Sequence, residues 1–391
     1  MPAAPSTIAP LKRLLSLDAL RGLTIAFMIM VNNNGGRSAW GFMHHAAWNG
    51  LTATDLVFPS FLFVVGMSIV FAFEARLAKG ATRGQLARHT MVRTAVLILL
   101  GIVVNSFPYF HLDHMRFYGV LQRIAVCYLL VSLFYLFDRR VWTKVVALVV
   151  ALVGYWVLMT CIPIPGVGLP GKDVVLLDPD QNLVSWLDRQ IMPYHLYEKS
   201  PDYNLRDPEG LLSDLPATGT ALLGLLTALW LRSNRSLNRK ALGMAVASAT
   251  WLALGYTWAI WFPLNKKLWT SSFVLTAAGW SLAVFALSFY LVEVKGWGKQ
   301  GWTSKLTFPW LVFGSNAIAA YMISELIPGI ALMFIWTENG KRQNALNWVR
   351  VHICGQIPDS GWAAFSYSFL FMAVCLVPVW IMYRKKIFLK V

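Results

Sequence analysis

The chain alternates between long apolar stretches and short polar connections. Ten of these stretches are roughly 15 to 23 residues long, close to the length that an α-helix needs to cross a bilayer. They cover residues 14–33, 54–74, 94–108, 117–137, 145–161, 214–231, 241–262, 270–291, 307–327 and 362–383. The pattern predicts an all-α, polytopic membrane helix bundle with about ten transmembrane helices, forming a single domain over residues 1–391.

The composition supports this interpretation. Hydrophobic residues make up 57% of the 391 residues and charged residues only 13%, which is too apolar for a soluble protein of this size. A further apolar piece, Pro328 to Trp336, is too short to span a membrane. We expect it to extend the ninth helix or to lie at the interface. The sequence shows no internal repeat and no second soluble domain.

The basic residues indicate the topology. The net charge of +16 is compatible with nucleic-acid binding, but the basic residues are dispersed among six short segments, so we expect no nucleic-acid partner. With a cytoplasmic N-terminus, the inner segments hold 21 of the 34 Lys and Arg residues and the longer outer loops hold 11. The positive-inside rule therefore predicts cytoplasmic N- and C-termini, with residues 34–53 and 162–213 outside.

The N-terminal segment resembles a signal peptide, because Lys12 and Arg13 precede an apolar run. Asp18 and Arg21 interrupt that run, and no clear cleavage site follows. We therefore expect an uncleaved first helix.

Candidate chemistry is concentrated in the first outer loop. His44 and His45 lie in this loop, Asn32 precedes it, Asn49 lies within it, and Asp55 begins the next apolar run. Histidine titrates near neutral pH and suits proton transfer. An amide, an imidazole and a carboxylate within one short connection therefore predict a reactive site.

Several polar residues lie inside or beside the predicted spans, where charged groups usually face the bundle interior. Asp18 and Arg21 are three residues apart and can pair on one helix face, so they either lock the bundle or bind a ligand. Gln122 and Arg123 begin the fourth span, and Arg123 can also snorkel to the surface. Asn316 and Glu325 are further interior candidates.

Two segments on the predicted outer side are further candidates for a functional role. A turn with Asn265, Lys266, Lys267 and Trp269 keeps two cations on the side that the positive-inside rule disfavours, which indicates an anionic or carbonyl partner or simple solvation. The 52-residue segment 162–213 is long enough to act as a lid, although a tolerated insertion is the alternative.

Other classes of site have little support. The histidines at 111 and 114 lack further ligands nearby, and we expect no metal site. The sequence has no phosphate-binding glycine loop and no hydrolase or zinc-protease motif. Cys161 and Cys354 both map to the outer side, where a disulfide is permitted but is not deducible from sequence.

Several motifs resemble the transmembrane acetyltransferases that include heparan-α-glucosaminide N-acetyltransferase, in its bacterial branch. The most specific block is His45-Ala46-Ala47-Trp48-Asn49-Gly50-Leu51-Thr52 followed by Asp55-Leu56-Val57-Phe58-Pro59. Weaker matches are Leu17 to Gly22, Val31-Asn32, Gly119 to Ala125, Asp207 to Leu212 and Asn265 to Thr270. Relative to the lysosomal member, the chain has no large luminal N-terminal region and no extra helix, which puts polymeric heparan sulfate in doubt as the substrate.

The resemblance implies that cytoplasmic acetyl-CoA donates its acetyl group to an amino sugar on the far side of a bacterial inner membrane. We expect His45 to act as general base or as transient acyl carrier, with Asn32, Asn49 and Asp55 as further catalytic residues. The expected acetyl-CoA-binding residues are Asp18, Arg21, Gln122, Arg123 and Asn316. The expected substrate-binding residues are Trp48, Glu209, Asn265, Lys266, Lys267 and Trp269.

The remaining predictions concern partners and alternatives. We expect membrane lipid and an amino-sugar or glycan acceptor as partners, and the sequence is compatible with a homodimer. A sugar or metabolite transporter is the main alternative, although neither inverted repeats nor interrupted helices are evident. A non-catalytic assembly protein is a further alternative that has no need for His45 beside paired amides.

Overall fold

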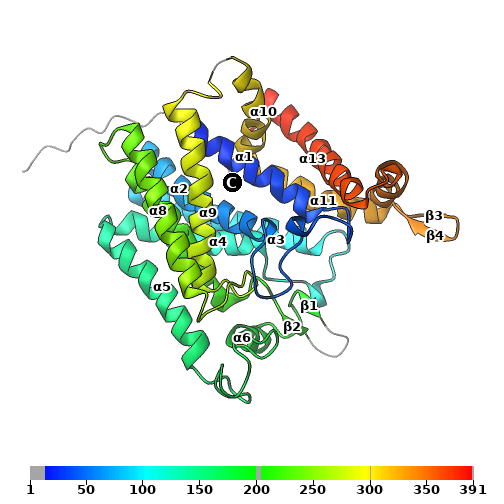
Figure 1. The fold of residues 1–391 in the computed structure, drawn as a ribbon, viewed down its shortest axis with the longest axis horizontal. Helices are drawn as coiled ribbons and strands as arrows, with labels where there is room; N and C mark the ends of the chain where they lie inside the picture. The colour runs from blue at the N-terminus through cyan, green and yellow to red at the C-terminus, as the bar shows by residue number, and fades with distance from the viewer. Residues whose placement is uncertain (1–13, 200–203, 300, 390–391) are drawn as a thin grey trace, which may run out of the picture.

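The computed structural model describes residues 14–199, 204–299 and 301–389. Three basic residues counted for the inner side, Lys12, Arg13 and Lys390, lie outside these ranges. The described residues are mostly helical (Figure 1). The helices are α1 Leu15–Asn32, α2 Val57–Leu77, α3 Arg83–Ser106, α4 Val120–Phe137, α5 Val141–Cys161, α6 Leu183–Ile191, α7 Asp214–Leu231, α8 Leu237–Trp258, α9 Ser271–Phe289, α10 Gly301–Ser315, α11 Ala317–Met333, α12 Ala345–Trp348 and α13 Ser360–Arg384.

Two short antiparallel hairpins accompany the helices. Strand β1 Glu198–Lys199 pairs with β2 Asn204–Arg206, and β3 Trp336–Glu338 pairs with β4 Lys341–Gln343. The β3–β4 hairpin projects from the bundle beyond α11 (Figure 1). The all-α prediction is therefore confirmed.

Eight helical segments of the described chain are long and apolar enough to cross a membrane. They contain α1, α2, α3, α4, α5, α7, α9 and α13, and the bent pair α10–α11 makes a ninth if it counts as one span. The seventh predicted span, 241–262, corresponds to α8, which has a suitable length but falls outside this apolar set. Its Gly, Ala, Ser and Thr residues lower its hydropathy and allow close packing, since Gly255 lies against Thr276 of α9.

Two expectations about the spans need correction. The third helix begins at Arg83, eleven residues before the predicted start, because Thr82 and Gln85 form a capping box and the first turns are too polar to register as apolar. The ninth span is not one helix, because α10 and α11 meet at an angle of 79°. Asn316 adopts a non-helical conformation there, and its side chain binds the backbone of Ile387 at 2.9 Å and Leu389 at 3.0 Å.

Two helix pairs pack almost backbone to backbone. A Cβ atom added to Gly66 of α2 would lie 1.9 Å from the carbonyl oxygen of Ala221 on α7, and one added to Gly224 would lie 2.0 Å from that of Phe63. Similarly, a Cβ on Gly22 of α1 would lie 1.7 Å from the carbonyl oxygen of Trp310 on α10. Any side chain at these glycines would separate the helices, so the close contacts fix the centre of the bundle.

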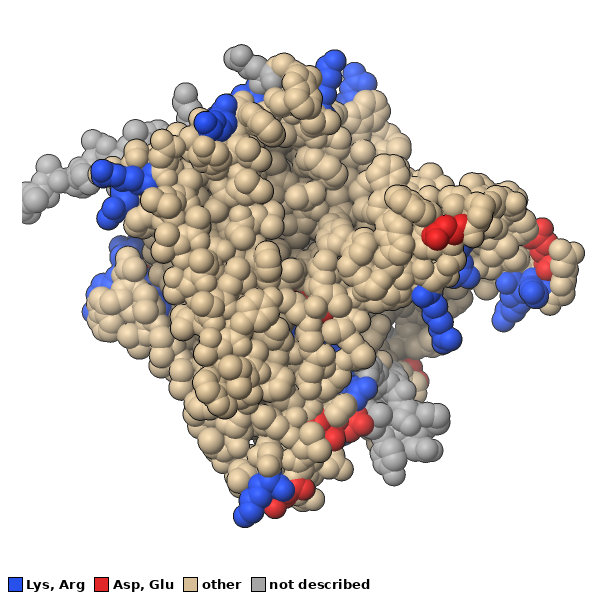
Figure 2. All heavy atoms as spheres, viewed as in Figure 1, with Lys and Arg blue, Asp and Glu red and all other residues tan. Residues whose placement is uncertain are grey.

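Charged side chains lie at the rims of the molecule. Figure 2 shows a broad uncharged surface over α8 and α9, with Lys and Arg but no Asp or Glu around the start of α8 and the end of α9. Acidic and basic residues occur together at the lower rim and on the β3–β4 hairpin. An uncharged belt between charged rims is typical of a multi-pass membrane protein.

The described residues of the large loop 162–213 fold against the end of the bundle that carries His45. Trp48 donates a 2.7 Å hydrogen bond to the carbonyl of Leu177, and Leu177 packs with Val184 of α6. The segment therefore covers the His45 loop, as the lid alternative requires.

Candidate active site

The His45 loop follows α1 and returns the chain to α2. Gly50 has a φ of 129°, a region that disfavours other residues, and its amide donates to the carbonyl of Leu264 at 2.8 Å. Asn265 reinforces this junction, because its Nδ2 donates to Oδ1 of Asn49 at 3.0 Å. The two loops are thereby joined, although they are more than 200 residues apart in the sequence.

His45 and Asp55 form a directly hydrogen-bonded pair. His45 Nδ1 lies 2.7 Å from Oδ1 of Asp55, whose side chain is 1% exposed. The other carboxylate oxygen accepts from the amides of Ala46 and Thr52 and from the Thr52 hydroxyl, at 3.0 to 3.1 Å. We therefore assign the proton to Nδ1, which leaves Nε2 as a potential base. Asp55 is thus placed to orient the imidazole and to hold it in this tautomer.

Lys266 lies against the same imidazole. Its Nζ is 3.3 Å from Nε2 and 3.4 Å from Nδ1 of His45. Burial lowers the pKa of the Lys266 ammonium, and the neighbouring cations Arg123 and Lys267 lower it further, while Glu209 and Asp55 oppose the shift. The amine is therefore placed to share a proton or a developing charge with His45.

These groups line a cavity of about 800 Å³. Five predicted residues besides His45 and Asp55 contribute to its wall: Asn32, Trp48, Glu209, Lys266 and Lys267. Trp48 offers an aromatic face, with Lys267 Nζ at 5.6 Å from the ring centroid. Asn32 donates to Oε1 of Glu325 at 3.0 Å, so α1 and α11 meet in this wall.

An ion-pair cluster closes another side of the cavity. Arg116 donates to both carboxylate oxygens of Asp207, at 2.8 and 2.6 Å, and also to Glu209. Burial alone would raise the pKa of Glu209, but Arg116, Arg123 and Lys266 outweigh burial and lower it. Glu209 is therefore anionic near neutral pH, and the cluster fixes segment 207–209 against the bundle.

Behind this cluster lies Asp188 of α6, with no exposed surface. Its Oδ1 accepts from the amide of Leu211 at 3.0 Å, whereas Oδ2 has no hydrogen-bond partner among the described residues. Burial, together with the charge of Asp207, raises the pKa of Asp188 to about 7. Asp188 thus carries a proton over part of the physiological pH range.

The predicted residues Arg123 and Trp269 support the site from below and do not line the cavity. Arg123 donates to Asp214 at 2.8 Å and to the carbonyl of Gly210 at 3.1 Å, and its guanidinium lies 5.0 Å from the Trp269 ring. Both side chains are essentially inaccessible. They hold the start of α7 against α4 and α9.

Three other predicted residues also lie away from the cavity. Asn49 is engaged with Asn265, Gln122 is buried against Gly101, and Asn316 holds the C-terminal segment at the opposite end. These three placements indicate supporting roles.

A second pocket, of about 250 Å³, lies at the opposite end of α1 and α2. Its polar lining includes four basic side chains: Arg21, Arg76, His89 and Arg93. No Asp or Glu belongs to this lining within the described residues. Arg21 donates to Ser68 at 2.9 Å and lies 3.4 Å from Asp18, so the predicted pair exists and one member reaches the pocket.

One buried donor in this pocket is available for an anionic ligand. The Nε of Arg93 is buried without a hydrogen-bond partner in the described chain, and its guanidinium lies 4.5 Å from the Tyr128 ring. Phosphate groups match clustered guanidinium donors.

Sequence reasoning missed Arg116, Asp188 and Asp207 as site residues. Arg116 carried the same signal as Lys266, since both are cations in segments that were predicted to lie on the outer side, where the positive-inside rule disfavours them. Asp207 lies in a quoted motif, but nothing local links it to Arg116, 91 residues earlier. Among the described residues, no group of three or more His, Cys, Asp or Glu side chains is placed to hold a metal ion, and all four cysteines are free thiols.

The fold and the cavity define a multi-pass α-helical membrane protein with a hydrogen-bonded pair of an exposed histidine and a buried carboxylate at one end of the bundle. Residues 13–173 match the family model described as heparan-alpha-glucosaminide N-acetyltransferase, catalytic. This part of the chain, which contains His45 and Asp55, is therefore similar to the catalytic region of that family, in agreement with the motifs.

Two curated relatives extend the similarity. Both are heparan-alpha-glucosaminide N-acetyltransferases, 27% identical in Homo sapiens and 25% identical in Mus musculus. Each comparison covers 97% of this chain but 60% of the relative. The chain therefore spans about three fifths of the length of these relatives.

Proposed function

We propose that the chain is a transmembrane acetyltransferase that moves the acetyl group of acetyl-CoA to the amine of an amino sugar. The observation that carries this proposal is the His45–Asp55 pair, which faces a cavity large enough for a sugar and lies in the segment that matches the catalytic region of the family. A base, an oriented carboxylate and nearby cations are the parts that acyl transfer requires.

The geometry supports a direct transfer step. The sugar nitrogen attacks the thioester carbonyl, and Nε2 of His45 accepts the proton that the nitrogen loses. The carbon–sulfur bond breaks, and the CoA thiolate leaves and takes up a proton. Lys266 Nζ, 3.3 Å from Nε2, stabilises negative charge on the carbonyl oxygen, with Asn32 as a second candidate donor. The predicted contribution of Asn49 is then indirect, through its bond to Asn265.

His45 could instead carry the acetyl group before the sugar binds. We favour the role of base, because the hydrogen bond to Asp55 and the contact with Lys266 hold the imidazole in place. Rapid acid quench of enzyme mixed with acetyl-CoA alone, followed by mass spectrometry, tests this choice. An acetylated peptide containing His45 would replace the direct step with a two-step transfer.

The basic pocket at the opposite end suits the phosphates of CoA. We propose that Arg21, Arg76, His89 and Arg93 bind these groups and that the pantetheine arm reaches toward His45 along the interior of the bundle. In this arrangement the termini and the basic pocket are cytoplasmic, the His45 cavity faces the periplasm, and the protein resides in a bacterial inner membrane.

Cysteine labelling tests this topology, because Ser38 and Asn234 are both exposed and lie at opposite ends of the bundle. We expect an impermeant reagent applied to intact cells to modify a cysteine placed at 38 and to spare one at 234. The opposite labelling pattern would invert the topology.

A transporter is the second candidate, and the broken helix pair α10–α11 favours it. Discontinuous helices often form substrate sites in transporters, and α10 and α11 meet at 79°. Proteoliposomes separate the two functions. We expect glucosamine added outside to be acetylated when acetyl-CoA is supplied inside, without net sugar uptake. Sugar exchange in the absence of acetyl-CoA, with no acetylated product, would support the transporter.

A further inference from the structure

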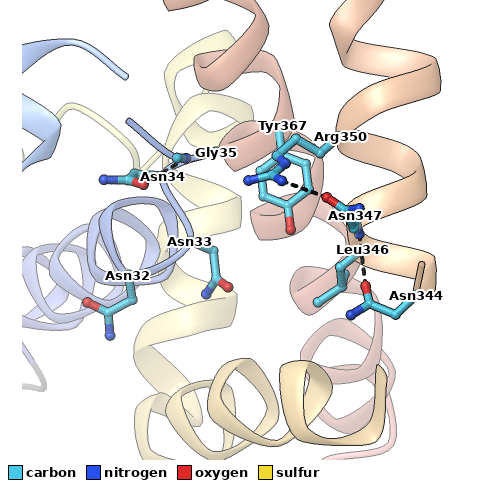
Figure 3. A pocket seen from close by; sticks show the side chains of 10 residues that line it. Asn32, Asn33, Asn34, Gly35, Asn344, Leu346, Asn347, Arg350 and Tyr367 are labelled. Carbon is cyan, nitrogen blue, oxygen red and sulfur yellow. Dashed lines mark hydrogen bonds between the residues drawn. The ribbon is translucent and has the colours of Figure 1, made fainter. Parts of the chain in front are cut away.

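A separate cavity of about 430 Å³ lies beside the end of α1, on the same side of the bundle as His45. Figure 3 shows its two walls, one formed by the chain that leaves α1 and the other by the chain around α12. Carboxamides dominate the polar lining: Asn32, Asn33, Asn34, Asn344 and Asn347. Arg350 and Tyr367 complete its polar side.

The amides are held in fixed positions. Asn34 donates to the carbonyl of Met43 at 3.0 Å and accepts from the amide of Gly36 at 3.1 Å. On the opposite wall, Oδ1 of Asn347 accepts from Arg350 at 2.6 Å, and Oδ1 of Asn344 accepts from the amide of Asn347 at 2.9 Å. A network of this kind pre-organises the cavity for a ligand.

Some hydrogen-bonding capacity in this cavity is unused. The side chain of Asn33 has no hydrogen-bond partner among the described residues, and it extends from the α1 wall into the space that faces Asn344 and Asn347 (Figure 3). Each carboxamide offers two N–H donors and a carbonyl acceptor, whereas a carboxylate or an ammonium offers only one kind of group. This mixture matches sugar hydroxyls, which both donate and accept.

The charge of the lining also favours a ligand with sugar hydroxyls. Arg350 is the only charged side chain in the lining among the described residues, so the cavity lacks the clustered cations of a polyphosphate site. It also lacks acidic groups that would select a cation. A neutral, hydroxyl-rich ligand with at most one negative group fits this lining.

The amide cavity adjoins the His45 cavity. Asn32 contributes to the lining of both, and Asn34 also lies 3.3 Å from the ring nitrogen of His44, next to His45. A ligand longer than one sugar would therefore occupy both spaces at once.

We propose that the amide cavity is a second saccharide subsite that binds the sugar next to the one being acetylated. This inference rests on the proposed acetyltransferase function, and it makes the acceptor a chain of at least two sugars. Asn33, Asn344 and Asn347 bind hydroxyl groups, and Arg350 binds a carbonyl or an acidic substituent.

Kinetics with acceptors of two lengths test the subsite. We expect the wild-type protein to have a KM about tenfold lower for a β-1,4-linked glucosamine disaccharide than for glucosamine. Asn347→Ala and Asn344→Ala should each remove most of this advantage while changing the KM for glucosamine less than twofold. Arg342→Ala, which removes an exposed cation from the β3–β4 hairpin outside the cavity, is the matched control and should behave as wild type.

Equal KM values for the two acceptors in the wild-type protein would overturn the proposal, as would an undiminished advantage in both Asn variants. Calorimetric titration of the disaccharide into wild-type and Asn347→Ala protein separates this inference from the proposed reaction. If no acetyl transfer occurs but the disaccharide binds the wild type and not the variant, the proposed acetyltransferase function is wrong, whereas the proposed saccharide subsite is supported. Thermal unfolding in detergent confirms that each variant is folded.

Discussion

At the end of the bundle that carries His45, cations and carboxylates are paired with one another, whereas the pocket at the opposite end has basic but no acidic side chains in its lining within the described residues. Arg116 and Lys266 each face a carboxylate or the imidazole, so the His45 cavity holds its geometry without a ligand. Arg76 and Arg93 have no acidic neighbour in the lining of their pocket within the described residues. The first region is organised for a reaction, and the second for an anion that arrives from outside.

Because of this difference, we expect mutations at the His45 end to change the transfer rate or the stability, and mutations in the basic pocket to change CoA binding. The largest effect is expected at His45. His45→Ala removes the proposed base and should lower the rate of acetyl transfer by at least 10² to 10⁴, a range typical of general acid–base catalysis. Acetyl-CoA binding should change little, because the basic pocket is remote.

His44→Ala is the matched control, since His44 contacts the backbone of Ala39 at 3.1 Å and does not line the cavity. We expect a much smaller loss, measured with radiolabelled acetyl-CoA in proteoliposomes. Equal, small losses in the two variants would remove His45 from the mechanism.

The second expected effect is on folding. Arg116→Ala leaves Asp207 and Glu209 buried without their main partner, which typically costs about 3 to 5 kcal/mol of stability. Arg206→Ala breaks a partly exposed pair with Asp180 and should cost no more than about 1 kcal/mol. Thermal unfolding in detergent measures both. Similar melting temperatures for both variants would show that the Arg116 cluster is not a structural element.

The third effect depends on pH. Because the pKa of Asp188 is about 7 in the folded protein and near 3.8 when unfolded, the folded state holds a proton that the unfolded state has released between these values. Stability should therefore fall as the pH rises through this window. Asp188→Asn keeps the acceptor for Leu211 and should flatten the profile and raise the melting temperature at pH 8. Parallel profiles for the two proteins would contradict this assignment.

The smallest effect concerns the basic pocket. Arg76→Ala or Arg93→Ala should weaken CoA binding about tenfold, by loss of a charge-assisted hydrogen bond, and leave stability almost unchanged. Higher salt should reduce the difference between wild type and variants. Arg83→Ala removes an exposed cation at the same end outside the pocket, and it should retain wild-type affinity in equilibrium binding. Unchanged affinity in both pocket variants would place the CoA phosphates elsewhere.

Sequence and structure agree best where the relevant residues are close in the chain. The helix positions follow from hydropathy, and the His45–Asp55 pair spans only ten residues, so a loop motif could indicate it. The break at Asn316 was missed, because the residues that stabilise it are Ile387 and Leu389. Hydropathy cannot report such distant partners, and the stretch 307–327 reads as one continuous span.

The predicted site residues fall into two groups: some line the cavity, and others bind partners inside the protein. Trp48, Lys266 and Lys267 reach the cavity because their loops meet there. Arg123 was predicted to bind acetyl-CoA and Trp269 to bind substrate, yet the hydrogen-bond partners of both side chains lie within the protein. A single sequence shows that a charge is buried but does not show whether its partner is a ligand or another residue.

Helix α2, which packs closely against α7, connects the His45 cavity with the basic pocket at the opposite end. Asp55 lies just before its first residue and Arg76 near its last, and the helix–helix contact at Gly66 lies between them. At 1.5 Å per residue, the 21 steps from Asp55 to Arg76 correspond to about 30 Å. For the proposed reaction, the donor must therefore extend over about this length, from phosphates bound near Arg76 to a thioester beside His45.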